Sequence, residues 1–219
     1  MSRLRARKIR GLPDDLPAGE RLLWQGAPSW RALSVRAFHI RKVAAYFALL
    51  ILWRVASGLA DGAGLAEIVA GCAGLATLAV AAIGILLMLA WLSARTTVYS
   101  ITSQRLVLRC GIALSMDLNI PFGRIGAAQL SLNGDGTGDI ALTLPKGTRI
   151  AYLNLWPHAR PWNFRAPQPT LRCIPQAARV ADLLSRSLAA ATGGQSHAVT
   201  ANVGEAISAP IPPQASAAA

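Results

Sequence analysis

The sequence has few charged residues, and acidic residues are scarcer than basic ones. Only 15% of its 219 residues are charged, and 10 Asp and Glu stand against 22 Lys and Arg, a formal net charge of +12. A typical soluble domain has about 25% charged residues, and a disordered chain is richer in charge and poorer in apolar residues. With 53% hydrophobic residues, the composition excludes a disordered chain, argues against an ordinary soluble enzyme and indicates a basic membrane protein.

Cysteine and histidine are also rare, which limits the metal and redox chemistry open to the chain. The three cysteines have no CxxC spacing, so neither a disulfide framework nor a zinc site is predicted, and a reducing compartment is the simpler interpretation. The three histidines show neither HxxxH nor HExxH spacing, and GxSxG is absent. No carboxylate pair is spaced for acid–base catalysis. We therefore expect no enzyme activity, no metal and no cofactor.

Long apolar runs, in contrast, occur twice. Residues 43–60 contain one charge, Arg54, and residues 68–92 contain none. As helices they would be roughly 27 and 37 Å long, against a hydrocarbon core of about 30 Å. The short acidic segment 61–67 joins them, so the pattern predicts a transmembrane helical hairpin. A cleaved signal peptide does not fit, because 42 residues of charged sequence precede the first run and a second run follows.

The basic residues predict the orientation of this hairpin. Ten Lys and Arg lie in residues 1–42, the connecting loop has none, and Arg95 follows the second run. The positive-inside rule then places both termini in the cytoplasm of a multi-pass protein of the bacterial inner membrane. Because this basic segment adjoins the membrane, lipid headgroups are the favoured partner and an acidic protein surface is the alternative. Nucleic acid is not expected, since the 11 basic residues of 93–219 are dispersed.

Two features of the runs have more than one interpretation. Arg54 is expected to snorkel outward or to pair with Asp61 or Glu67; the alternative is an arginine that faces a partner or a pigment. The second run carries small residues at four-residue spacing. Such a face packs closely against the chain's own first helix or docks another membrane protein or a second copy. These small residues are Ala66, Ala70, Gly74, Ala73, Thr77 and Ala81.

After residue 96 the apolar pattern changes to the alternation of β-strands. Six strands are predicted, at 98–102, 106–110, 112–120, 125–132, 139–144 and 149–155. An irregular stretch at 156–172 precedes a helix over 175–191, one face of which carries Ala177, Val180, Ala181, Leu184 and Leu188. The predicted fold is an α+β membrane protein in which a small antiparallel β-barrel or sandwich, closed by a C-terminal helix, adjoins the hairpin. The predicted divisions are 1–42, 43–92, 93–191 and a disordered tail, 192–219.

Several motifs carry a resemblance to a known class of protein. LPAGERLLWQGAPSW (16–30) resembles the leader of bacterial membrane proteins with a pleckstrin-homology-like (PH-like) domain. YSITSQRLVLRCG (99–111) is similar to the opening hairpin of that domain, and NIPFGRI (119–125) to the end of its third strand. The resemblance implies that the β domain has the PH-like form.

A narrower resemblance rests on four further motifs. RGLP (10–13), LWQGAPSW (23–30), RAFHIRKVA (36–44) and LWPHARPW (155–162) resemble the PuhB family of purple bacteria, which is encoded beside the reaction-centre H subunit. This implies a non-enzymatic role in assembling or stabilising the photosynthetic reaction centre and its core light-harvesting complex. The implied partners are the subunits of these complexes, with self-association as a further expectation. The alternative is a general PH-domain membrane protein that binds lipid or protein and is unrelated to photosynthesis.

Eight residues are candidates for partner binding, because Trp and Arg dominate binding hot spots and because several of them lie near the predicted membrane surface. In a Pro-rich connector, however, the tryptophans of 156–162 can equally pack on the β domain. His39 is placed where an imidazole can bind the magnesium of a chlorophyll, although a solvated histidine is the simpler interpretation, and bacteriochlorophyll binding stays open. The candidates are Trp24, Trp30, His39, Arg54, Trp156, His158, Arg160 and Trp162.

Overall fold

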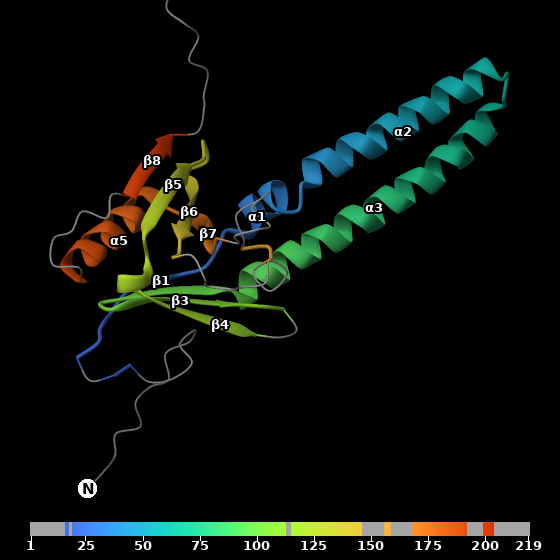
Figure 1. The fold of residues 1–219 in the computed structure, drawn as a ribbon. Helices are drawn as coiled ribbons and strands as arrows, with labels where there is room; N and C mark the ends of the chain where they lie inside the picture. Colours follow the sequence, from blue (N-terminus) through green and yellow to red (C-terminus); the bar gives the residue numbers. More distant parts are fainter. Residues whose placement is uncertain are drawn as a thin grey trace, which may run out of the picture.

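The structure is a computed structural model with two parts, a long helical hairpin and a β-sandwich (Figure 1). It describes residues 16–17, 19–112, 115–145, 156–158, 168–191 and 199–203. The hairpin consists of α2 (Ile40–Ala60) and α3 (Leu65–Thr96), and a short helix α1 (Trp30–Arg36) lies at its base. The predicted α+β class, with two apolar helices, antiparallel sheets and a C-terminal helix, is confirmed.

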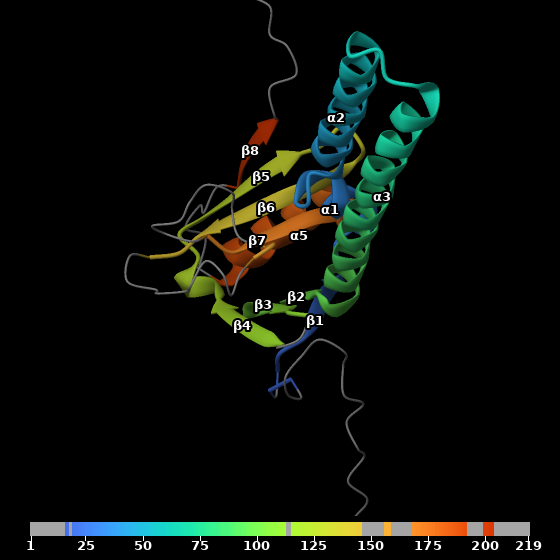
Figure 2. The same ribbon diagram turned by 90° about the vertical axis from the view of Figure 1, so that its right-hand side faces the viewer.

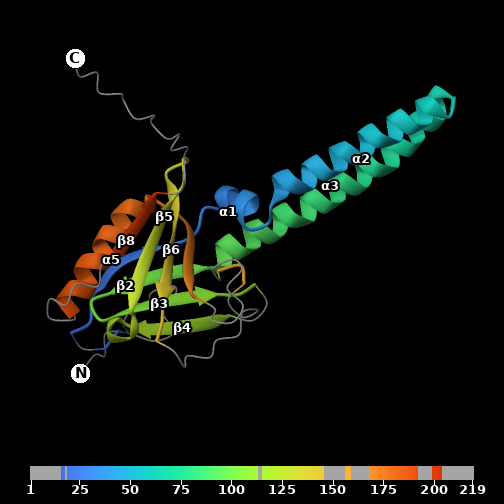
Figure 3. The same cartoon turned by 45° about the horizontal axis from the view of Figure 1, so that its top comes forward.

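Both hairpin helices are long and apolar enough to cross a membrane. They project away from the sandwich (Figure 3), and only 6% and 11% of their most apolar windows are buried. A core helix of a soluble protein would instead be mostly buried, so the two helices indicate membrane association. Each extends beyond its predicted range of 43–60 or 68–92 at the end nearest the sandwich.

The packing of α3 settles which of its faces meets α2. Its more buried positions include Ile68 and Ala79, whereas all six small residues of the four-residue repeats are exposed. The prediction that the small residues contact the chain's own first helix is therefore wrong. They lie on a face of the hairpin that α2 does not cover.

The sandwich contains two four-stranded sheets and no closed barrel among the described residues (Figure 2). One sheet is antiparallel throughout, in the order β1 (Leu22–Gly26), β2 (Val98–Thr102), β3 (Arg105–Cys110) and β4 (Met116–Pro121). The other has the order β7 (Thr170–Pro175), β6 (Thr137–Thr143), β5 (Ala127–Leu132) and β8 (Val199–Val203), with β8 parallel to β5. The short 3₁₀ helix η1 (Phe122–Arg124) connects the sheets.

The core lies between the sheets and under α5 (Ala177–Ala191). Side chains such as Tyr99 and Leu106 from one sheet meet Ile140 and Leu171 from the other, all fully buried. The predicted apolar face of α5 is confirmed, since all five of its residues are buried against this core.

Three strands differ from the prediction. β1 lies in the segment 1–42 that was set apart, so the β domain draws on residues from both sides of the hairpin. β7 occupies part of the stretch predicted to be irregular, and it pairs with β6 in place of a hairpin between 139–144 and 149–155. β8 lies in the tail predicted to be disordered, which is wrong for Val199–Val203. Residues 149–155, 192–198 and 204–219 lie outside the described part.

Candidate functional site at the base of the hairpin

The hairpin and the sandwich meet around α1. Ala32 and Leu33 of this helix pack against Ala90 and Ala94 of α3 in one small apolar cluster. The backbone N–H of Ser29, at the start of α1, donates to the carbonyl of Cys173 in β7 at 2.8 Å. Small alanines allow α1 and α3 to approach closely, and the bond from Ser29 ties both to the sandwich. We call this region the junction.

A buried polar network lies inside the junction and includes His158. Its Nε2 lies 2.9 Å from Thr97 Oγ1, and its Nδ1 lies 2.8 Å from the Tyr99 hydroxyl. That hydroxyl also accepts from the backbone N–H of Arg172 at 3.2 Å. A neutral imidazole satisfies both contacts, because one nitrogen donates and the other accepts. The network thus joins the end of α3, β2 and β7 to residues 156–158.

Arg172 extends the network toward α1. Its guanidinium donates to the carbonyl of Pro157 at 3.1 Å and to that of Arg36 at 3.5 Å. Its Nε lies 3.8 Å from Asp139 Oδ2, which is within ion-pair range but beyond hydrogen-bond distance. This Nε has no hydrogen-bond acceptor among the described residues. Asp139 also accepts from the backbone N–H of Cys173 at 2.7 Å. One buried arginine therefore connects two carbonyls from separate segments with a carboxylate.

Burial sets the protonation of these groups. It lowers the pKa of His158 to about 3, with a smaller contribution from the charge of Arg172, so the imidazole is neutral at pH 7. Burial also raises the pKa of Tyr99 well above its usual value and that of the Cys173 thiol to about 12. A thiol that stays protonated is a poor nucleophile and metal ligand. We therefore interpret the network as a set of contacts that hold these segments together.

The structure places the partner-binding candidates of the segment 156–162 in different environments. His158 is 1% exposed, so the prediction that it contacts a partner is wrong in this structure. Trp156 is 49% exposed, and its ring meets that of Phe38 edge-on at 5.3 Å. It remains a candidate for partner contact. Arg160 and Trp162 lie outside the described residues.

The other candidates have separate environments. Trp24 is half-buried in β1 and packs on the sandwich core. Trp30 is 40% exposed at the start of α1, with the Arg31 guanidinium 5.5 Å from its ring centre. His39 is exposed and adopts a left-handed backbone conformation, φ 51°, at the turn into α2. No three of these residues share one site.

Arg54 is held inside the hairpin. A Cβ built on Gly71 of α3 would lie 2.6 Å from Arg54 Nε, so the guanidinium passes across the bare backbone of that glycine. Among the described residues Arg54 forms no ion pair with Asp61 or Glu67. The predicted pairing with these acids is wrong. The glycine at position 71 provides the room that the arginine occupies.

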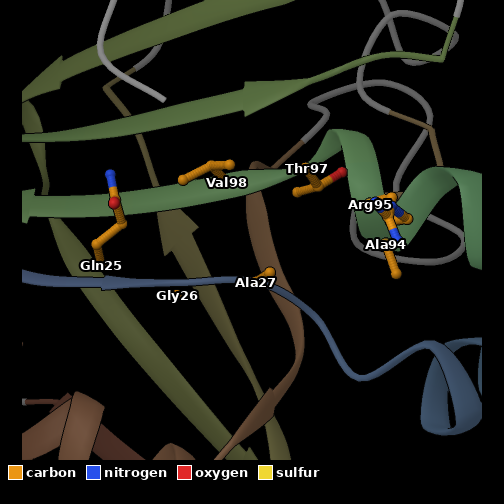
Figure 4. A pocket seen from close by; sticks show the side chains of 7 residues that line it. All are labelled: Gln25, Gly26, Ala27, Ala94, Arg95, Thr97 and Val98. Atoms are coloured by element: carbon orange, nitrogen blue, oxygen red, sulfur yellow. The ribbon is translucent and has the colours of Figure 1, made fainter. Parts of the chain in front are cut away.

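Cavities open around the junction in the part of the chain that the structure describes. One, of about 510 Å³, lies between β1 and the end of α3. Figure 4 shows that Gln25 and Gly26 line it from one side, and Ala94 and Arg95 from the other. A second cavity, about 120 Å³, lies between Trp156 and α3. No group of three or more His, Cys, Asp or Glu side chains gathers in the part of the chain that the structure describes.

The third cavity was not anticipated from the sequence. It measures about 360 Å³ and is lined by Arg31, Arg36 and Arg41 together with Asp135 of the turn between β5 and β6. In the sequence these arginines were part of the basic segment 1–42, which predicted topology and contact with lipid headgroups, but no cavity was predicted. Their spacing of five residues, from α1 into the first turn of α2, does not predict a shared helix face, because residues three or four apart share a face. The contribution of Asp135 has no local signal in the sequence either.

Comparison with known proteins identifies the class of this chain. The bacterial PH domain family matches residues 35–188. The chain belongs to this family. Its match to the bacterial PH domain family begins in α1, includes both hairpin helices and ends in α5, while β1 lies outside the matched range.

One relative of this bacterial PH domain protein is an uncharacterized 23.7 kDa protein in the puhA 5′ region of Rhodobacter capsulatus. It is 41% identical over 180 residues, which cover 81% of this chain and 83% of the relative. No solved structure matches the chain.

Proposed function

We propose that this chain is a non-enzymatic, integral membrane assembly factor of the PuhB type, which helps to assemble or stabilise the photosynthetic reaction centre and its core light-harvesting complex. The observation that carries the proposal is the 41% identity, over 81% of the chain, with a protein named for its place in the puhA 5′ region. The four motifs that resemble the PuhB family point to the same locus, because that family is encoded beside the reaction-centre H subunit.

The architecture supports a scaffolding mechanism. The hairpin presents the small-residue face of α3, which α2 leaves uncovered, and small residues let membrane helices approach closely. The sandwich is held to the base of the hairpin by the network around His158 and Arg172. A reaction-centre or light-harvesting 1 helix bound to α3 would thereby be placed at a set position relative to the sandwich. Exposed Trp156 lies at this junction and is the proposed contact for the soluble part of a partner.

The proposed location is the bacterial cytoplasmic membrane and its photosynthetic invaginations, with both termini in the cytoplasm. Two features support this orientation: residues 1–42 contain ten basic residues, and the loop between α2 and α3 contains one acid, Asp61, and no basic residue. Membrane lipids are then immediate neighbours of the junction.

A gene deletion tests the assembly role. The strain without this gene should show reduced reaction-centre absorbance and a reduced level of the core antenna under photosynthetic growth, and the wild-type gene should restore both. A variant with Ala70 and Ala73 replaced by Leu, which crowds the small-residue face, should restore less. Ala76→Leu makes the same change on an exposed position turned away from that face and should restore fully. Normal levels of both complexes in the deletion strain would contradict the proposal.

A second function is favoured by the family match itself, because the bacterial PH domain family is not defined by photosynthesis. In that case the chain is a general membrane-anchored PH-domain protein that binds lipid or protein. A defect of the deletion strain that appears equally during respiratory growth in the dark would favour this second function.

A further inference from the structure

The cavity lined by Arg31, Arg36 and Arg41 is more basic than the other two cavities described above. Three guanidinium-bearing side chains meet there, from α1 and from the first turn of α2, with Asp135 as the one acid. Arg36 lies 3.9 Å from the Asp135 carboxylate. That carboxylate also accepts hydrogen bonds from the backbone N–H and the hydroxyl of Thr137, which together with Arg36 lower its pKa. The cavity therefore has a net charge of about +2 at neutral pH.

The position of the cavity relative to the apolar helix points to its ligand. Arg41 is the second residue of α2, and the apolar run of that helix begins at Val43, about 3 Å further along its axis. In Figure 2, α1 lies at the base of the hairpin, beside the end of β5 where the turn to β6 closes the cavity. When α2 spans a membrane, as in the proposed function, the three arginines stand at the depth of the lipid headgroups.

The positive charge of the lining residues determines which kind of headgroup can bind. A phosphodiester is an anion that guanidinium groups bind through short, charge-assisted and often bidentate hydrogen bonds. Basic pockets beside membrane helices on the cytoplasmic side hold anionic headgroups in this way. A zwitterionic headgroup would bring a quaternary ammonium toward three positive charges and is disfavoured. The volume of about 360 Å³ leaves room for a phosphoglycerol headgroup.

We propose that this cavity is a binding site for the phosphate of one anionic phospholipid, held by Arg31, Arg36 and Arg41. Two of the three arginines precede the span on α1, so a bound lipid bridges α1 to the first turn of α2. The turn at Gly134–Asp135 brings the sandwich to the same headgroup. The lipid thereby contributes to the orientation of the sandwich relative to the membrane surface. This inference rests on the membrane insertion in the proposed function.

The test measures lipid retention by the purified full chain. The protein is held in micelles of a non-ionic detergent containing phosphatidylglycerol or phosphatidylcholine, and native mass spectrometry counts the lipids bound to each chain. We expect one phosphatidylglycerol per chain and little phosphatidylcholine. Arg41→Gln and Arg31→Gln should each weaken phosphatidylglycerol binding about tenfold, because each removes a charge-assisted contact with the phosphate. Circular dichroism should confirm that the exposed substitutions leave the fold intact.

Two control substitutions distinguish binding at a specific site from general attraction of the lipid to surface charge. Lys42→Gln removes the same charge one residue further along α2, but Lys42 does not line the cavity, and Arg21→Gln removes an exposed arginine at the start of β1. Both should change retention by no more than about twofold, because neither side chain lines the cavity and salt screens the attraction of exposed charges that do not contact the phosphate. Equal losses in Lys42→Gln and Arg41→Gln would overturn the proposal.

A competition arm distinguishes a lipid from free phosphate. Inorganic phosphate should displace phosphatidylglycerol only in large excess, because the acyl chains lying along α2 add to the affinity of the lipid. Displacement of phosphatidylglycerol by an equal concentration of inorganic phosphate would contradict the proposal that the bound phosphate belongs to a lipid. No reaction-centre subunit is present in these measurements, so a failure to retain lipid would not contradict the assembly role. A deletion strain with normal complexes would not contradict the lipid site.

Discussion

At the scale of single residues, His158 is closely constrained by its surroundings. Its imidazole is 1% exposed and has a partner on each nitrogen, and burial lowers its pKa from 6.5 to about 3. In the unfolded chain the histidine binds a proton below pH 6.5, whereas in the folded chain it stays neutral down to about pH 3. The folded state therefore loses stability as the pH falls through that window. The loss has a limiting slope of about 1.4 kcal/mol per pH unit.

The acid sensitivity assigned to His158 can be tested by substitution. Thermal unfolding of the full chain in detergent, followed by circular dichroism, should show a falling melting temperature between pH 6 and pH 4. His158→Gln lacks a titrating group, so its curve should be flatter, although it is less stable at pH 7 by about 1–3 kcal/mol because the network is disturbed. His39→Gln removes an exposed histidine and should keep the wild-type slope. An unchanged slope in His158→Gln would contradict the assignment.

The difference between Trp156 and His158 shows where prediction from sequence stops at this scale. Both were predicted as partner contacts because both residues lie in one aromatic and proline-containing segment. Burial of His158 is decided by Thr97 and Tyr99, which are 61 and 59 residues away in sequence. No local pattern carries that information. The exposure of Trp156, in contrast, agrees with the surface role that was predicted for it.

At the scale of elements, Arg54 and Gly71 explain how α2 and α3 pack. A methyl group at Gly71 would lie 2.6 Å from Arg54 Nε, so Gly71→Ala should push this flexible guanidinium aside, at a cost that offsets part of the gain in helix propensity. Gly74→Ala is the matched control, since its Cβ would meet no atom within 4 Å and alanine favours the helix. Unfolding in mixed detergent micelles should rank Gly71→Ala below Gly74→Ala.

A double substitution makes this test specific. If steric conflict is the cause, Arg54→Ala should remove most of the additional cost of Gly71→Ala, because the two side chains would no longer meet. Additive effects of the two substitutions would instead show that Gly71 matters for another reason.

A second glycine matters where α5 approaches β6. A Cβ on Gly138 would lie 2.6 Å from the Cβ of Ala177 and 2.8 Å from the carbonyl oxygen of Ser131. Neither atom can withdraw without moving backbone, so Gly138→Ala should destabilise the fold by about 2–4 kcal/mol. Gly134→Ala, in the same glycine-rich turn, meets no atom within 4 Å and should have little effect. Equal melting temperatures for the two variants would contradict this account of the α5–β6 contact.

Elements with strong local signals could be predicted, and elements that depend on distant partners could not. The two apolar helices, the β2–β3 hairpin and the apolar face of α5 follow from periodicity within short windows. β1 pairs with β2, which follows the hairpin in the sequence, and β8 lies in a tail whose composition favours disorder. β7 carries Arg172 at its centre, and this charge is accommodated only because Asp139 and two carbonyls from other segments surround it.

At the scale of the whole molecule, charge and apolar surface are distributed between the two parts of the fold. The apolar side chains of α2 and α3 are largely exposed, which is stable only in a membrane or against another apolar surface. The basic residues at the base of the hairpin, including those around the arginine-lined cavity, lie where these helices meet the sandwich. The expected topology and the proposed headgroup contact therefore depend on the same charges, and α2 does not cover the small-residue face of α3.

This distribution predicts the orientation of the chain in the membrane. The loop between α2 and α3 has no basic residue, so Gly64→Cys should react with a membrane-impermeant maleimide added to intact spheroplasts. Arg179→Cys, on an exposed position of α5, should react only after the membrane is permeabilised. Gly64 tolerates the change, because a Cβ there meets no atom within 4 Å.

The native cysteines make this labelling experiment clean. Cys110 and Cys173 are buried, and burial raises the pKa of both thiols, so they remain protonated and unreactive. Cys72 lies within α3, in the apolar span. The unsubstituted chain is the control and should not be labelled. Labelling of Arg179→Cys in intact spheroplasts, with Gly64→Cys protected, would reverse the orientation and place the arginine-lined cavity at the outer leaflet. A chain in which both positions react without permeabilisation would instead lie on the outside of the membrane and not span it, because a spanning hairpin must separate the loop from α5.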